Sequence, residues 1–224
     1  MIKFYFHPTP NPMKVALCLE ELALPYELIP VDTLKGQQHT AEYRVMNPNG
    51  KAPTIVDNGK RVFDSNAILM YLSEKTGLLA GKTEDRSEML SWLMFLATGL
   101  APFSGQSVHF RHAAPEQVPY AINRYLFEAK RHYEVLEIHL EGREYIVGDE
   151  YSIADISAWG WIDKATVVLG EDGLASYPNL KRWFESINTR PAVEKARNIA
   201  KDIAFKSDFD DEAARALYPQ NFTE

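Results

Sequence analysis

The sequence predicts two parts of different fold class: an α/β domain of order βαβ-ββα, followed by an all-helical domain. Three observations lead to this prediction. Residues 2–31 read as strand, helix and strand. The pair Asn58-Gly59 between two short apolar runs is a strong signal for a β-hairpin. Beyond Gly81, helical periodicity replaces strand signals almost completely, which indicates a separate helical layer.

The first three elements follow from local residue choice. Residues 2–6 are apolar and aromatic, and residues 26–31 form a similar run, so both are typical of strands. Between them, Asn11 is a good helix N-cap, Pro12 suits the first helical position, and residues 15–22 carry apolar side chains at helical spacing. Strand, helix and strand in this order favour a parallel pair with a right-handed crossover.

A hairpin and a helix complete the first part. Residues 54–57 and 61–63 flank the Asn58-Gly59 turn, and a short helix is expected near Glu42. Residues 65–75 read as a helix that ends at Gly77. The simplest closure is a four-stranded mixed sheet with helices on its faces.

Helical periodicity covers most of the second part. The predicted helices are residues 84–100, 116–141, 153–168, 177–188 and 191–204. We divide the chain into a first domain (1–77), a linker (78–83), a helical domain (84–204) and a polar, acidic tail (205–224). The tail is expected to be loosely held, although four side chains could dock on the surface: Phe209, Leu217, Tyr218 and Phe222.

Composition excludes several classes of function. The net charge is −7 without a basic block, so nucleic-acid binding is disfavoured as a main role. No apolar run reaches the roughly 20 residues that cross a bilayer, and the N-terminus does not resemble a signal peptide, so we expect a cytoplasmic protein. The single cysteine, Cys18, is expected to be a buried, inert thiol. His109 and His112 form only a loose pair, and no metal site is expected.

A candidate binding site surrounds Pro53. Because proline cannot donate a ladder hydrogen bond, the backbone of Ala52 is left partly unpaired and could pair with an extended peptide. One hairpin later, Asp64 and Ser65 supply a helix N-terminus with a carboxylate beside it. These groups suit a small zwitterionic peptide, whereas the structural alternative for Asp64 and Ser65 is a simple N-cap pair.

Other polar residues carry structural readings beside functional ones. Thr9 and Asn11 lie before the first helix, where they either cap the turn or face a negatively charged ligand atom. Ser152 and Asp155 have capping-box spacing, and replacing either by Ala is expected to cost about 1 kcal/mol. Arg131, with Arg124 on the same helix face, is by default a solvated arginine.

Several segments together resemble a known family, the cytosolic glutathione transferases. The matching segments are residues 5–11, 35–38, 48–53, 105–115 and 151–155. The resemblance covers roughly residues 1–204 and is closest to the Nu class, the group related to bacterial disulfide-bond oxidoreductases. It implies a thioredoxin-like first domain, glutathione as co-substrate, no metal, and a homodimer. Residues 9–11 and 109–115 are the more specific signals.

The resemblance also implies roles for individual residues. Pro53 is expected to be cis, with the Ala52 backbone pairing with the cysteinyl part of glutathione. Thr9 and Asn11 are expected at the sulfur, and the remaining glutathione contacts are assigned to Gln38, Lys51, Asp64, Ser65 and Arg131, with His39 as an addition. Phe103, His109 and Phe110 are expected to line the second-substrate pocket. Because the first turn holds Pro10 and no cysteine, a mixed disulfide with the protein is excluded there.

The chemistry required of this site is the formation of a thiolate. A thiol of pKa near 8.5 is only about 3% ionised at pH 7, and lowering its pKa by two units takes about 2.7 kcal/mol. A hydrogen bond to the anion supplies about 1.5–3 kcal/mol, so Thr9 and Asn11 suffice. We predict a glutathione-dependent disulfide-bond reductase and glutathione transferase with weak peroxidase activity. The alternatives are a conventional transferase acting on a small-molecule electrophile, and a non-catalytic glutathione-fold regulatory or binding protein.

Overall fold

The computed structural model describes residues 1–222 and contains a four-stranded sheet of order β2-β1-β3-β4. β1 (Ile2–Phe6) pairs in parallel with β2 (Tyr26–Pro30), and in antiparallel fashion with β3 (Thr54–Asp57), which continues through a hairpin into β4 (Lys60–Phe63). These strands confirm the predicted sheet of the first part. Asn58 and Gly59 both have positive φ angles, as the tight hairpin requires.

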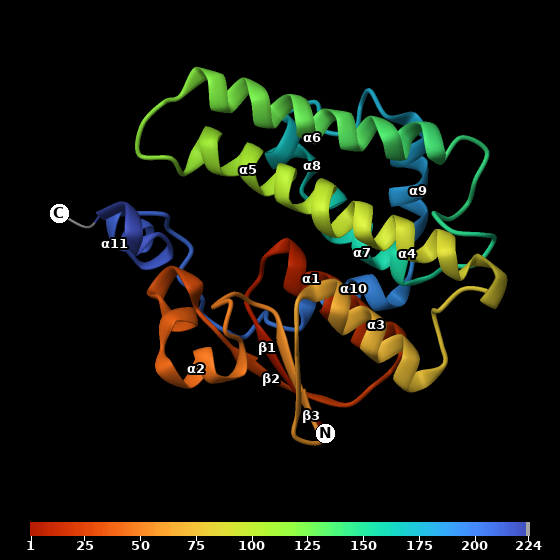
Figure 1. The fold of residues 1–224 in the computed structure, drawn as a ribbon, viewed down its shortest axis with the longest axis horizontal. Coiled ribbons are helices and arrows are strands. Elements are labelled where there is room, and N and C mark those ends of the chain that lie inside the picture. Colours follow the sequence, from red (N-terminus) through yellow and green to blue (C-terminus); the bar gives the residue numbers. More distant parts are fainter. Residues whose placement is uncertain (223–224) are drawn as a thin grey trace.

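Three helices accompany the sheet (Figure 1). They are α1 (Pro10–Glu21), α2 (Ala41–Met46) and α3 (Ser65–Thr76), and two 3₁₀ turns, η1 (Thr33–Lys35) and η2 (Gln37–His39), precede α2. The predicted N-cap of α1 is wrong: Thr9 is the N-cap, because its backbone is extended and Pro10 takes the first helical position. Asn11 therefore lies inside the first turn, with its side chain available for other contacts.

The second part is helical. Its helices are α4 (Arg86–Phe95), α5 (Ala101–His112), α6 (Pro119–His139), α7 (Ile153–Ile162), α8 (Ala165–Leu169), α9 (Pro178–Asn188) and α10 (Pro191–Asn198). A 3₁₀ turn, η3 (Thr83–Asp85), precedes α4, and one π-helical stretch, η4 (Leu96–Leu100), joins α4 to α5. The predicted helix ends near Leu100, and α5 was not predicted, because Pro102 and Gly105 disfavour a helix. Pro102 lies where the π-helical stretch passes into α5.

Two further predicted helices are shorter than the sequence suggested. The stretch 153–168 is interrupted by a turn at Asp163 and Lys164, and α10 ends at Asn198 rather than at 204. In η4, Gly99 is necessary because a Cβ there would lie 2.3 Å from Nε2 of the buried His132. Small residues at such a site let two helices approach closely.

One apolar core runs through both parts of the molecule. α1 of the first part packs against α3 and against α7 and α10 of the second part, and Trp159 and Ile156 of α7 are fully buried. Cys18 is fully buried in α1, and burial raises its thiol pKa well above the ordinary value. The predicted domain limits at 77 and 84 stay a prediction.

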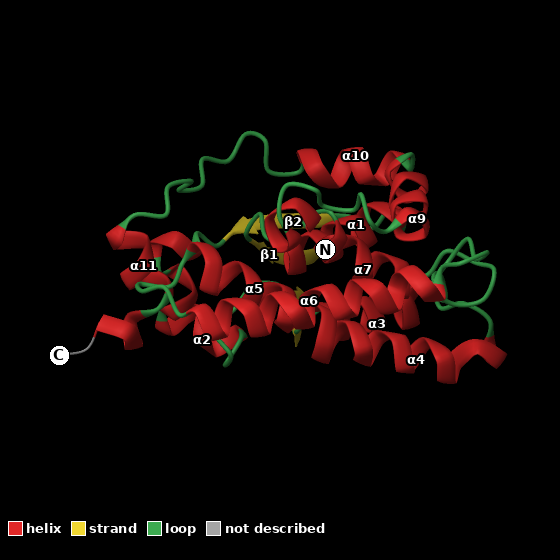
Figure 2. Cartoon of the chain, turned by 90° about the horizontal axis from the view of Figure 1, so that it is seen from above, coloured by secondary structure: helices red, strands yellow, loops and turns green. Residues whose placement is uncertain are grey.

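The C-terminal residues are packed against the molecule, contrary to the expectation of a loose tail. An extended segment leaves α10, crosses the sheet edge and ends in α11 (Asp211–Leu217) and the 3₁₀ turn η5 (Pro219–Phe222), as Figure 2 shows. Phe205 places its ring against those of Phe6 and His7. The last two residues of the predicted tail, 223 and 224, lie outside the described residues.

Candidate functional site

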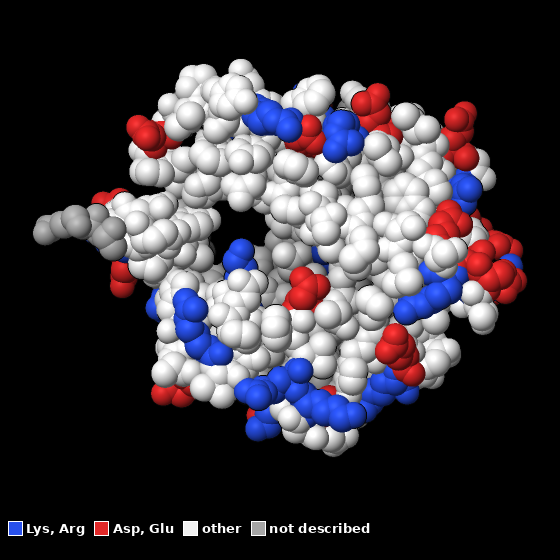
Figure 3. All heavy atoms as spheres, viewed as in Figure 1, with Lys and Arg blue, Asp and Glu red and all other residues white. Residues whose placement is uncertain are grey.

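Three chain segments meet at one end of the sheet, where strands begin or end. Tyr5 lies opposite Thr54, and Thr54 lies opposite Phe63. The end of β1, the start of β3 and the end of β4 therefore lie side by side. The predicted site residues next to these strand ends are Thr9, Ala52, Pro53, Asp64 and Ser65. Figure 3 shows a deep hollow between the C-terminal segment and the two parts of the chain, with a basic and an acidic side chain on its lower rim.

Thr9 and Asn11 lie at the N-terminal end of α1. Thr9 is exposed, and its hydroxyl makes no capping hydrogen bond. The Oδ1 atom of Asn11 accepts a hydrogen bond from the indole Nε1 of Trp161 in α7 at 3.0 Å. Because that bond engages the amide oxygen, it fixes the orientation of the Asn11 amide. The Nδ2 group that remains can only donate hydrogen bonds. The corner thus combines a free hydroxyl, an amide donor and the positive end of a helix, all of which favour an anion.

The Ala52–Pro53 peptide bond is cis, as the resemblance implied. The ladder of β3 begins at Thr54, so the backbone of Ala52 lies outside it. The preceding carbonyl, that of Lys51, accepts hydrogen bonds from the Tyr43 hydroxyl at 2.9 Å and from Asn47 Nδ2 at 2.5 Å. The loop is thereby held in place while the side chain of Lys51 remains exposed.

Asp64 and Ser65 begin α3. Asp64 has a φ of 72°, an unusual conformation for a residue with a side chain, of the kind that recurs at functional sites. Its Oδ1 atom accepts hydrogen bonds from the N–H groups of Asn66 and Ala67, at 2.9 and 3.2 Å. Two of the amides expected to be free are therefore already capped. The second carboxylate oxygen of Asp64 and the N–H of Ser65 remain for a ligand.

Gln38 and His39 form a polar group beside this loop. Gln38 is buried, and its amide nitrogen donates to the Ala216 carbonyl at 3.4 Å and contacts His39 Nε2 at 3.2 Å. The other ring nitrogen of His39 contacts Arg44 at 3.1 Å. A Cβ on Gly50 would lie 3.2 Å from the Gln38 carbonyl, so Gln38 packs directly against the loop that carries Lys51.

The predicted second-substrate residues lie on α5. The rings of Phe110 and Tyr125 are stacked at 5.1 Å, and Phe103 contacts His132 at 5.1 Å. His109 lines a cleft of about 370 Å³ in which Lys51 lies on one side and helix α5 on the other. The cleft residues are Lys51, Gly105, Gln106, His109, Tyr218, Gln220 and Asn221. Lys51 of the first part and His109 of the second part therefore line the same cleft.

Arg131 is not brought together with the other predicted residues. It pairs with Glu128 at 2.9 Å on the same helix, and it lines a different pocket with Phe127 and Tyr177. Its contact with glutathione stays a prediction.

Sequence reasoning missed two groups at the site. Trp161 meets Asn11 across 150 positions of the chain, which no local pattern could indicate. Lys14 lies on α1, and its fully buried side chain packs against Gly160 of α7. Burial lowers the pKa of Lys14 to about 7, while the charge of Asp64 partly opposes this. A lysine at helical spacing among apolar residues was the available signal for Lys14.

Within residues 1–222, no cluster of three or more potential metal-ligating side chains is present. Across the same described range, no helix is long and apolar enough to cross a membrane.

Comparisons with known proteins agree with this geometry. Residues 1–74 match the model of the glutathione S-transferase N-terminal domain, and residues 111–191 match that of the C-terminal domain. The chain is 46% identical over 204 residues to the disulfide-bond oxidoreductase YfcG of Escherichia coli, covering 88% of this chain and 94% of that protein.

Two solved structures are also similar. A glutathione transferase from Burkholderia graminis, with two glutathione molecules bound per subunit, is 38% identical with a TM-score of 0.82 and coverage of 89% and 88%. A glutathione transferase from Pseudomonas putida, with one glutathione disulfide per subunit, is 34% identical with a TM-score of 0.81 and coverage of 88% and 91%.

Proposed function

The chain belongs to the glutathione S-transferase family, and on that premise we propose that it is a glutathione-dependent disulfide-bond reductase whose reacting thiolate is that of bound glutathione. The observation that carries this proposal is the corner formed by Thr9 and Asn11. A free hydroxyl, an amide held with its donor outward by Trp161, and a helix N-terminus converge there. The non-catalytic alternative has no support among the relatives described above.

The proposed reaction is thiol–disulfide exchange in two steps. The glutathione thiolate attacks one sulfur of the disulfide, a new S–S bond forms, and the other sulfur leaves as a thiolate that takes a proton from water. A second glutathione then resolves the mixed disulfide and yields glutathione disulfide and the second thiol. Relatives that hold two glutathione molecules or one glutathione disulfide support a site of the required size.

The other polar groups near these strand ends suit the remaining parts of the tripeptide. We assign the cysteinyl backbone to Ala52, before cis-Pro53, where the ladder leaves a strand position open. The free oxygen of Asp64 suits the γ-glutamyl ammonium, and the N–H of Ser65 suits its carboxylate. Gln38 and Lys51 are assigned to the glycyl carboxylate.

The direct test is reduction of a small disulfide by glutathione in Thr9→Ala and Asn11→Ala. Each variant loses one donor to an anion, so we expect turnover at neutral pH to fall by about tenfold or more. Thr83→Ala and Asn123→Ala, which change exposed residues outside the site, are the matched controls. Unchanged turnover in both site variants would remove the proposed roles of Thr9 and Asn11.

We further propose that the protein is a cytoplasmic homodimer that also acts weakly on small-molecule electrophiles and peroxides. Support for a dimer comes from Val45 and Phe63, which are 67% and 41% exposed and line one surface pocket. Light scattering should give twice the monomer mass of 25.5 kDa, and Phe63→Ser should weaken the association. A monomer at all concentrations would contradict this proposal.

A further inference from the structure

The C-terminal segment forms one wall of the cleft beside the proposed glutathione site. We propose that Tyr218 in this segment is a specificity-determining residue that limits the size of the second substrate; the inference rests on the proposed function. It therefore concerns which disulfides reach the thiolate, not how the thiolate forms.

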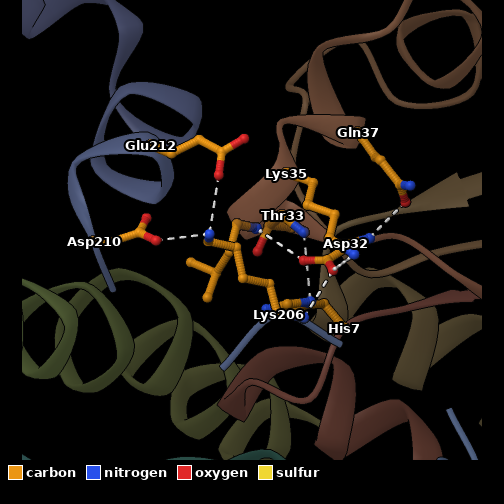
Figure 4. A network of polar contacts seen from close by, with 9 residues as sticks. His7, Asp32, Thr33, Lys35, Gln37, Lys206, Asp210 and Glu212 are labelled. Atoms are coloured by element: carbon orange, nitrogen blue, oxygen red, sulfur yellow. Dashed lines mark hydrogen bonds and ion pairs between the residues drawn. The ribbon is translucent and has the colours of Figure 1, made fainter. Parts of the chain in front are cut away.

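The segment is anchored to the first part of the chain at its beginning (Figure 4). The backbone N–H of Lys206 donates to Oδ2 of the buried Asp32 at 2.9 Å. The ammonium of Lys206 lies 2.8 Å from Asp210 and 3.1 Å from Glu212, which holds the start of α11 over this anchor. The ring of Phe205 adds an edge contact with His7, with centroids 5.2 Å apart.

α11 itself rests on the two 3₁₀ turns of the first part. Gly36 has a φ of 74°, and a Cβ there would lie 3.6 Å from the Cβ of Ala216, so the helix approaches this turn closely. The Ala216 carbonyl accepts the hydrogen bond from Gln38. Because Gln38 packs against the loop of Lys51, the position of α11 is linked to the predicted glycyl end of the glutathione site.

At its end, the segment reaches the helical part across the cleft. The ring of Tyr218 meets His109 of α5 edge to face, with centroids 4.9 Å apart and an interplanar angle of 71°. Tyr218 and Lys51 line the same cleft, together with Gln106. The pKa of Tyr218 is raised by burial, in keeping with a ring that is largely shielded from water.

This arrangement bounds the cleft between Lys51 and α5, through which a second substrate would approach the proposed glutathione site. The rings of Tyr218 and His109 pack against each other, and Tyr218 directly follows α11. Tyr218 therefore cannot move far without breaking the contacts that hold α11 in place. A compact disulfide can reach the site beside Tyr218, whereas a bulky one must displace the ring. Removing the ring should therefore lower KM for bulky disulfides and leave compact ones nearly unchanged.

The test compares Tyr218→Ala with wild type on two disulfides with alkyl leaving thiols, bis(2-hydroxyethyl) disulfide and the bulky bis(2-benzamidoethyl) disulfide, so that the uncatalysed exchange with glutathione stays slow for both. We expect the ratio of kcat/KM, bulky over compact, to rise about fivefold through KM. Tyr218→Phe keeps the ring and should behave as wild type. Tyr120→Ala, at a tyrosine that is 80% exposed on α6, is the matched control. A ratio within about twofold of wild type in a folded Tyr218→Ala protein would overturn the inference.

A binding measurement separates this inference from the proposed function. If wild type reduced neither disulfide, the proposed function would fail, and the inference would then be read from calorimetry with S-methyl and S-hexyl glutathione. Tyr218→Ala should gain affinity for the S-hexyl compound relative to the S-methyl compound by about fivefold. Equal gains, or none, would overturn the inference. A wild type that turns over both disulfides, with an unchanged ratio in the variant, would overturn only the role of Tyr218.

Discussion

Trp161→Phe tests whether the Asn11 amide is held with its donor toward the glutathione sulfur. The substitution removes the indole N–H that lies 3.0 Å from Asn11 Oδ1 and keeps an aromatic ring beside α5. A net hydrogen bond of this kind contributes about 0.5–1.5 kcal/mol. At about 1.4 kcal/mol per pKa unit, loss of the fixed amide orientation should raise the pKa of bound glutathione by about 0.4–1 unit.

Asn11→Ala removes the donor itself and should have the larger effect. A hydrogen bond to a charged group contributes about 1.5–3 kcal/mol, which corresponds to about 1–2 pKa units. The assay is the pH dependence of kcat/KM for a small disulfide, supported by thiolate absorbance of glutathione in the complex. We expect the thiol pKa to increase in the order wild type, Trp161→Phe, Asn11→Ala.

The double variant decides the mechanism. If Trp161 acts only through Asn11, Trp161→Phe combined with Asn11→Ala should match Asn11→Ala alone, because the two changes act on one interaction. Trp92→Phe, in which the lost N–H has no hydrogen-bond partner among the described residues, is the matched control. Additive pKa shifts in the double variant, or a Trp161→Phe profile equal to wild type, would refute the reasoning.

Three further predictions concern stability. Asp155→Ala should lower the free energy of unfolding in urea by about 4 kcal/mol, well beyond a capping effect, because four buried donors lose their acceptor: the N–H groups of Ile146 and Ser152, the Ser152 hydroxyl and the Trp183 indole. Ser152→Ala should cost only about 1 kcal/mol, and equal losses would contradict this. Gly99→Ala should cost about 1–3 kcal/mol in thermal unfolding through overlap with His132, and adding His132→Ala should restore part of the loss. Burial lowers the pKa of Lys14 to about 7. As the pH rises, the native chain therefore releases this proton at a lower pH than the unfolded chain does. The wild type should therefore gain up to about 2.7 kcal/mol over Lys14→Met between about pH 7 and pH 9, and a constant difference in urea titrations would exclude it.

The sheet and most helices could be predicted because their signals are local. Asn58 and Gly59 determine a hairpin by their backbone preferences, and apolar spacing indicates α3 and α6. α5 was not predicted because Pro102 and Gly105 disfavour a helix locally. The packing of α5 against α6 and α8 outweighs that local preference.

The site was predictable only in part, for the same physical reason. Thr9 and Asp64 follow β1 and β4, and Pro53 directly precedes β3, so strand order brings all three to the same end of the sheet. The contacts of Asn11 with Trp161 and of His109 with Tyr218 join segments more than 100 positions apart, which no periodicity encodes. Arg131 illustrates the opposite limit, since its helix face could be predicted but not the pocket to which that face belongs.

The depth of Cys18 has a consequence for how this protein would withstand oxidants. Thiolate character and solvent access govern the conversion of cysteine to sulfinic and sulfonic acids, and the one cysteine of this chain has neither. Peroxide that irreversibly oxidises the exposed cysteine of other reductases would here meet no exposed protein thiol and would oxidise the soluble tripeptide instead. Fresh glutathione would then restore the reacting thiol, without repair of a protein cysteine.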